Sequence, residues 1–478
     1  MQFLLYLCTV NNDFLRMKRL CMLLVAVMCL GIAGVSSVVA APKYVIYVIG
    51  DGMSPNHVMG AEMYLAELEG RIGRVPLRMT QFPYTGFLTT YSVSNAITCS
   101  SAAGTALATG VKTRNGYEGV DTLKQPLTSI ATLLHNQDWA VGILTSASID
   151  HATPASFYTH TTDRNDYYHI GQDLVRSDFD FFGGAAFQHP GVPENEPNGI
   201  DLYAMTERAG YVVARTYEEG EAALEADKLM VVQDGVSLPY EINTSKEDLH
   251  LPELTSLALR FLESKDRPFF LMVEGGLIDW ANHGNDGATS LRETVDMDRA
   301  VEVIYQFYLQ HADETLVVIT ADHDCGGFAL ANGGYKLNLQ ALQYQTMSSD
   351  YLTDSIRALH TQRGEDLTWE EVRDLIARAT GLYTHTNVSD DEDKDLHKSF
   401  DRMMRREDSD VKTMYKSYNR LGSAAIALLN AKAHLGWTSH SHSAAPVPVF
   451  AIGVGAEDFV GWYDNTEIVP RMMKIINE

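Results

Sequence analysis

Residues Tyr44–Met53 read YVIYVIGDGM, a run of six apolar residues followed by a turn that contains Asp51. The apolar run lacks alternation between apolar and polar positions, which is typical of a strand buried on both faces of a parallel sheet. Four later runs share this character: Ala140–Leu144, Phe269–Val273, Leu316–Ile319 and Val447–Val454. The sequence therefore predicts at least five buried parallel strands.

Helical patterns separate these runs, for example at Pro252–Glu263 and Glu293–Gln310. Strands that alternate with helices predict an α/β fold with a mostly parallel central sheet sandwiched between helices. The stretch 331–418 interrupts this alternation, and we interpret it as an insertion that returns through a helix at Leu421–His434.

The insertion contains two further signals. Thr368 and Glu371 form a capping-box pattern that predicts the start of a helix reaching Arg378. The charge-dense run Ser389–Arg406 is interpreted as a solvated face or a flexible loop.

The N-terminus has the pattern of an export signal. Met17–Arg19 is basic, Leu20–Val35 is apolar, and Val38 and Ala40 are small residues placed as at a cleavage site. We interpret 1–41 as a signal peptide with an N-terminal extension, and 42–478 as the exported catalytic chain, periplasmic or secreted. An uncleaved membrane anchor is the alternative, although the apolar run is short for one. We expect no stable membrane span after cleavage.

Composition excludes several classes of protein. The chain has 478 residues and a formal net charge of -25, so its acidic surface would repel a phosphate backbone and we expect no nucleic-acid binding. Only Cys99 and Cys325 follow the signal, too few for a disulfide framework, and whether they pair is open.

Acidic residues follow three of the predicted strands. Asp51 follows the first strand, Glu274 follows Phe269–Val273, and Asp322 with His323 follows Leu316–Ile319. Because ligands of open α/β sheets bind at the carboxyl ends of the strands, we expect these side chains to converge. Such carboxylates repel one another when they are desolvated, so bound cations are the natural resolution.

Histidines near these acids extend the candidate metal site. Asp279 and His283 are spaced four residues apart, which places both on one face of a helix and within reach of one metal. His440 and His442 precede the last predicted strand. Mixed His and Asp ligation suits zinc, whereas ligation by oxygen alone suits magnesium.

The small-residue stretch 98–113 reads TCSSAAGTALATGVKT. Small residues that open a helix leave free backbone N–H groups where an anion can bind, and Ser100 there is a candidate nucleophile. The stretch lacks the spacing of a P-loop and the Cys-x-Pro-x-Arg pattern of formylglycine sulfatases. Downstream, Asp150–Pro154 is followed by Arg164, whose guanidinium is suited to clamp two phosphate oxygens.

Together these motifs resemble the alkaline phosphatase family. The motifs are GDGM (50–53), the stretch 98–113, HATP (151–154) with Arg164, EGGLIDWANH (274–283), ADHD (321–324) and a late histidine. The resemblance implies an exported, usually dimeric α/β enzyme that hydrolyses small phosphate monoesters with two Zn²⁺ and one Mg²⁺. The insertion at 331–418 resembles the variable crown of the family.

The resemblance also implies roles for individual residues. Ser100 matches the nucleophile that becomes phosphoserine, and Arg164 matches the phosphate clamp. The resemblance also implies three metal sites. The first has Asp279, His283 and His442 as ligands, with His440 as the alternative to His442. The second has Asp51, Asp322 and His323, and the third has Asp51, Thr153 and Glu274.

Three positions depart from the pattern of many members. Cys99 stands where many have Asp, so the hydrogen bonds that orient Arg164 are expected to differ. His151 and Trp280, which we place near the third metal, resemble another branch of the family and leave that metal's identity open. A phosphodiesterase or sulfatase of the same superfamily is the second hypothesis, and a non-catalytic phosphate- or metal-binding protein is the third.

Overall fold

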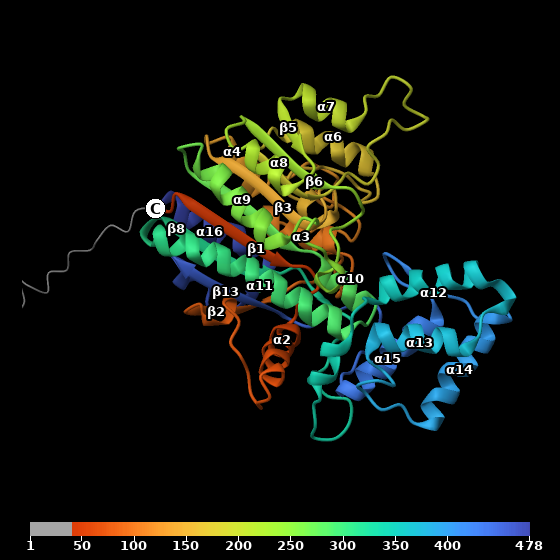
Figure 1. The fold of residues 1–478 in the computed structure, drawn as a ribbon. Coiled ribbons are helices and arrows are strands. Elements are labelled where there is room, and N and C mark those ends of the chain that lie inside the picture. The colour runs from red at the N-terminus through yellow and green to blue at the C-terminus, as the bar shows by residue number, and fades with distance from the viewer. Residues whose placement is uncertain (1–40) are drawn as a thin grey trace, which may run out of the picture. The chain divides into compact units, whose positions relative to one another are not determined.

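A ten-stranded sheet runs through the computed structural model, which describes residues 41–478 (Figure 1). The strand order is β14-β2-β13-β8-β1-β7-β3-β4-β6-β5. The strands are β1 (Tyr44–Gly50), β2 (Tyr84–Thr89), β3 (Ala140–Ser148), β4 (Phe181–Ala185), β5 (Tyr211–Ala214), β6 (Lys228–Gln233), β7 (Phe269–Gly275), β8 (Thr315–Ala321), β13 (Val447–Gly453) and β14 (Gly461–Asp464).

The predicted α/β class is confirmed, with one correction. All five predicted strands are present and buried, but β13 is antiparallel to both of its neighbours, β8 and β2. The reason lies in the preceding segment, since β12 (His442–Ser443) pairs with β9 (Asp324–Cys325) just beyond the carboxyl end of β8. The chain therefore enters β13 from that edge of the sheet and must run in the opposite direction.

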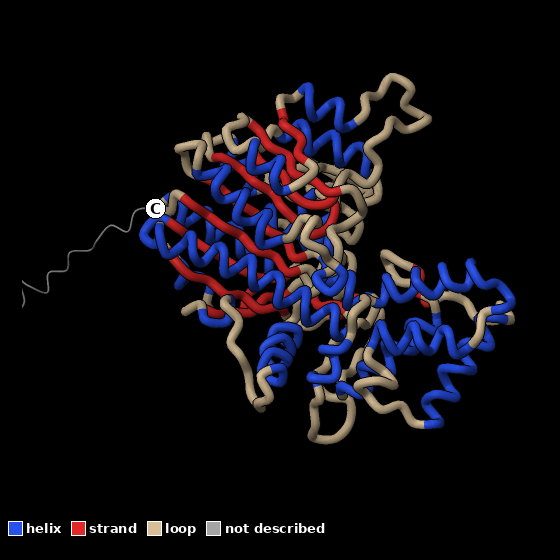
Figure 2. Tube along the Cα trace, viewed as in Figure 1, coloured by secondary structure: helices blue, strands red, loops and turns tan. Residues whose placement is uncertain are grey.

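Helices flank the sheet (Figure 2). Helices α9 and α11 pack on each other and on the central strands, and in Figure 1 they lie over the sheet, roughly along its strands. The helices outside the insertion are α2 (Pro55–Leu68), α3 (Ser100–Thr109), α4 (Ile130–His135), α5 (Ala152–Ala155), α6 (Tyr167–Ser177), α7 (Leu202–Arg208), α8 (Tyr217–Ala222), α9 (Leu251–Glu263), α10 (Leu277–His283), α11 (Gly287–Gln310) and α16 (Ile468–Asn477).

The register of the central strands aligns their carboxyl ends. Gly50 of β1 pairs with Gly275 of β7 and with Ala321 of β8, so Asp51 and Asp322 leave the sheet at the same level. Thr145 of β3 pairs with Glu274 of β7. One edge of the sheet thus gathers the predicted acids.

Four helices within and just after the stretch 331–418 contribute to a second apolar core: α12 (Ser349–Arg363), α13 (Trp369–Thr380), α14 (Asp390–Met404) and α15 (Arg420–Ala433). The short strands β10 (Val411–Lys412) and β11 (Ser417–Tyr418) form an antiparallel hairpin between α14 and α15. The capping box of Thr368 and Glu371 opens α13, as predicted.

The charge run Ser389–Arg406 is mostly helical, so of the two interpretations it is the solvated face of a helix and not a flexible loop. Ser389 and Glu392 form a capping box that opens α14, while Leu396 and Phe400 are buried and the charged side chains face solvent. The predicted signal, apart from Ala41, lies outside the described residues. No helix within residues 41–478 has the length and apolar character needed to cross a membrane.

Candidate active site

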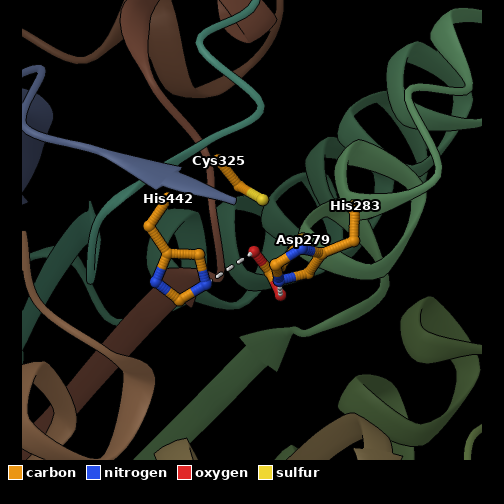
Figure 3. Close-up of side chains that lie close together, drawn as sticks. All are labelled: Asp279, His283, Cys325 and His442. Carbon is orange, nitrogen blue, oxygen red and sulfur yellow. Dashed lines mark ion pairs between the residues drawn. The ribbon is translucent and has the colours of Figure 1, made fainter. Parts of the chain in front are cut away.

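The first cluster joins α10 to β12. Asp279 and His283 share one face of α10, as the four-residue spacing predicts, and His283 Nε2 lies 3.3 Å from Asp279 Oδ2. His442 Nε2 lies 3.6 Å from Asp279 Oδ1. Figure 3 shows these side chains converging, with the sulfur of Cys325 beside them. All four ligand-type atoms lie within 4.8 Å of one another and all four residues are buried.

Backbone carbonyls orient the two histidines. His283 Nδ1 donates to the carbonyl of His440 (2.6 Å), and His442 Nδ1 donates to the carbonyl of Thr98 (2.9 Å). Each neutral ring therefore presents the lone pair of Nε2 to the cluster, the arrangement that metal-binding histidines use. His440 instead directs its own Nδ1 to the carbonyl of His283 (3.0 Å), behind the cluster.

The second cluster surrounds His323 at the end of β8. His323 Nε2 lies 3.1 Å from Asp322 Oδ2 and 3.4 Å from Asp51 Oδ1. Asp322 Oδ1 accepts hydrogen bonds from the backbone N–H groups of Gly52 (3.1 Å) and His323 (2.8 Å), which fixes the carboxylate. Its Oδ2 and both oxygens of Asp51 accept no hydrogen bond from residues 41–478.

The third cluster contains Asp51, His151 and Glu274, whose ligand-type atoms also lie within 4.8 Å of one another. Glu274 accepts a hydrogen bond from the hydroxyl of Thr145, which holds one oxygen in place. The other Glu274 oxygen and the buried hydroxyl of Thr153 have no hydrogen-bond partner within the described chain.

These buried acids repel one another in the absence of a cation. Burial, followed by the charges of Asp322 and Asp279, raises the pKa of Asp51 well above its usual range. Burial also raises the pKa of Glu274 to about 7. Since desolvated carboxylates without partners are costly, the unpaired oxygens and histidine lone pairs fit divalent metals. The residues therefore form a metal-binding site.

Ser100 lies beside His323 of the second cluster. It is the first residue of α3, where free backbone N–H groups and the helix dipole favour an anion. Its hydroxyl oxygen is fully buried and lies 3.2 Å from His323 Nε2. Cys99 occupies the N-cap position of α3, but its side chain makes no capping hydrogen bond. Its sulfur lies 3.1 Å from Ser101 Oγ. Cys99 and Cys325 are both free thiols, so they do not pair.

Arg164 approaches the site with neutral partners only. Its Nη2 donates to His151 Nε2 and to the hydroxyl oxygen of Tyr415, each at 3.4 Å. Its buried Nη1 has no partner, and no carboxylate of residues 41–478 forms an ion pair with this guanidinium. Burial raises the pKa of the nearby Glu118 carboxyl well above its usual range, which favours its neutral form. The guanidinium charge is thus left available to an anion.

The structure brings every predicted site residue into this region, and it adds two further residues, Cys325 and Tyr415. Trp280 lies on the ring of Tyr415 with centroids 4.6 Å apart. Cys325 was missed although it stands two residues after His323, in the pattern that already supplied ligands. Tyr415 was missed because it belongs to the insertion, 251 residues from Arg164, and no local pattern marks it.

Comparison with known proteins identifies the family of the chain. The family model described as alkaline phosphatase matches residues 42–177 and 197–478. Alkaline phosphatase 3 of Bacillus subtilis is 29% identical over 445 residues, covering 91% of this chain and 89% of its own.

Two solved structures share the fold. The cold-active alkaline phosphatase from Shewanella sp. has a TM-score of 0.76 and 28% identity, covering 91% of this chain and 100% of its own. The Thermus thermophilus alkaline phosphatase has a TM-score of 0.77 and 27% identity, covering 92% of each chain. The fold and the site therefore define a metal-dependent phosphohydrolase. The chain belongs to the alkaline phosphatase family, and it is a phosphoric monoester hydrolase.

Proposed function

We propose that this enzyme hydrolyses small phosphate monoesters through a phosphoserine formed on Ser100. The observation that carries the proposal is the position of the Ser100 hydroxyl, at the start of α3 and 3.2 Å from Nε2 of His323, a residue of the second buried cluster. A serine acts as a nucleophile when the pKa of its hydroxyl is lowered, and nearby positive charge lowers that pKa.

Two Zn²⁺ and one Mg²⁺ are proposed for the three clusters. The first, with two imidazoles and a nearby sulfur, suits zinc, and the second adds an imidazole to two carboxylates. The third combines Glu274, Asp51 and the Thr153 hydroxyl, a set rich in oxygen that suits magnesium. When bound, such metals stabilise the serine alkoxide, the leaving oxygen and the attacking water.

The protein residues then perform two displacements. Ser100 Oγ attacks phosphorus as the bond to the substrate oxygen breaks, giving phosphoserine and an alcohol. Water attacks the phosphoserine next, which releases inorganic phosphate and restores Ser100. Arg164 binds phosphate oxygens through both steps, and this positioning with charge stabilisation supplies most of the catalysis. Arg164 favours a monoester dianion over a diester or a sulfate ester, which carry less charge.

We also propose the cellular and quaternary setting. Residues 1–41 act as an export signal, the mature chain 42–478 works in the periplasm or outside the cell as a homodimer, and 331–418 is an insertion in its catalytic domain. Sedimentation of the purified mature chain tests the dimer, and sequencing of its N-terminus tests the cleavage.

Turnover of chromogenic esters tests the proposed function. Purified enzyme is assayed with a phosphate monoester, a matched diester and a sulfate ester, before and after chelation and with zinc and magnesium added back. The proposal expects monoester turnover that chelation removes and the metals restore. Faster turnover of the diester or the sulfate ester would contradict it.

A further inference from the structure

A tyrosine from the insertion reaches the candidate active site. Tyr415 lies in the turn between β10 and β11, where the backbone N–H of Thr413 donates to the carbonyl of Lys416 (2.9 Å). Its ring stacks on Trp280 with an interplanar angle of 18° and meets the edge of His283 at 5.3 Å between centroids. The insertion thus forms part of the wall of the site.

The hairpin that carries Tyr415 is fastened to α12. Arg357 donates to the Asp410 carboxylate (2.6 Å) and to the carbonyl of Ser417 (2.7 Å), on either side of the turn. Lys416 donates to the Asp354 carboxylate at 2.7 Å. Because both arms of the hairpin are held, the position of Tyr415 is set before any substrate binds.

Tyr415 and His151 share the same guanidinium nitrogen. Both accept from Arg164 Nη2 at 3.4 Å, and neither carries a negative charge in its neutral form. Holding an arginine with neutral acceptors fixes its plane without cancelling its charge.

Cys99, directly before Ser100, offers Arg164 no such support. Its sulfur accepts from the backbone N–H of Gly116 (3.2 Å) and contacts Ser101, and it provides no carboxylate to hold Arg164. We propose that Tyr415 is a positioning residue for Arg164, through which the insertion completes the phosphate clamp. This inference rests on the proposed function, in which Arg164 binds the phosphate group.

A double-mutant cycle tests the inference. Tyr415→Phe keeps the ring that stacks on Trp280 and removes only the hydroxyl. We expect it to raise the Kd of inorganic phosphate for the metal-loaded enzyme roughly 3–20-fold, because one hydrogen bond to a charged group is lost. In the Arg164→Ala variant, the same substitution should cause no further loss of phosphate affinity, since Tyr415 acts through Arg164.

Calorimetric titration with phosphate measures all four proteins, and metal content and unfolding temperature verify that each is intact. Tyr351→Phe is the matched control, because Tyr351 lies on α12 with 47% of its surface exposed. Equal affinity of Tyr415→Phe and the wild type, losses that add in the double variant, or an unchanged affinity in Arg164→Ala would each overturn the inference. Absence of monoester turnover by the metal-loaded wild type would contradict the proposed function, while phosphate affinities would still report the coupling of Tyr415 to Arg164.

Discussion

The Ser100 hydroxyl and His323 Nε2 face each other at 3.2 Å, although 223 residues separate them in the chain. Ser100 opens α3, and His323 follows β8, whose end is level with the end of β1. This contact connects the predicted nucleophile to the predicted metal ligands.

Ser100→Ala should abolish turnover and spare the metals. The substitution removes the attacking oxygen but none of the buried carboxylates or imidazoles that fill the clusters. We expect monoester kcat to fall by at least about 10³-fold. Metal analysis by mass spectrometry should find the wild-type content. Comparable kcat in the variant would exclude Ser100 as the nucleophile.

His442 and His440 should differ sharply in metal binding. His442 Nε2 faces Asp279, whereas His440 supports His283 mainly through a backbone carbonyl that survives side-chain removal. His442→Ala should weaken the first zinc site by more than about 100-fold, and His440→Ala by less than about 10-fold. Competition with a zinc indicator measures both, and the reverse order would make His440 the ligand.

Cys325→Ser should weaken zinc binding at the first cluster. The sulfur lies with Asp279, His283 and His442 in one group, and changes next to a metal cost about 10–100-fold in affinity. Cys99→Ser is the matched control, because Cys99 lies outside that group. Titration of metal-free protein provides the affinities. Equal zinc affinity in the Cys325 variant and the wild type would show that the sulfur takes no part.

Stability of the metal-free protein should fall as the pH rises. The pKa of Glu274 is raised from 4.5 to about 7 in the folded state, so folding favours its protonated form. Between these values the unfolded chain loses its proton while the folded chain retains it, and the folded state loses relative stability. Thermal unfolding from pH 4.5 to 7 measures the trend. Added metals should remove the Glu274 contribution, and an identical pH dependence with and without metals would contradict this.

The central strands were predictable because their apolar runs are uninterrupted, as in YVIYVI at 44–49. Strand β4 reads FFGGA, in which two glycines interrupt the apolar signal, and its burial follows from pairing with β3 and β6. The predicted parallel direction of β13 was wrong, because the direction of a strand depends on the edge of the sheet from which the chain enters it.

The site was predictable where ligands follow a strand or share a helix face, since those positions are local properties of the chain. Asp51, Asp322 and the pair on α10 are of this kind. Tyr415 was not, because its contact with Arg164 depends on how the hairpin of the insertion is held to α12.

Trapping the covalent intermediate would identify the nucleophile of this enzyme. The metal-loaded enzyme is mixed with a phosphate monoester, quenched in acid and digested, and its peptides are examined by mass spectrometry. We predict one phosphoryl group on Ser100, absent when substrate is omitted. Rapid monoester turnover with the phosphoryl group on another residue would contradict it.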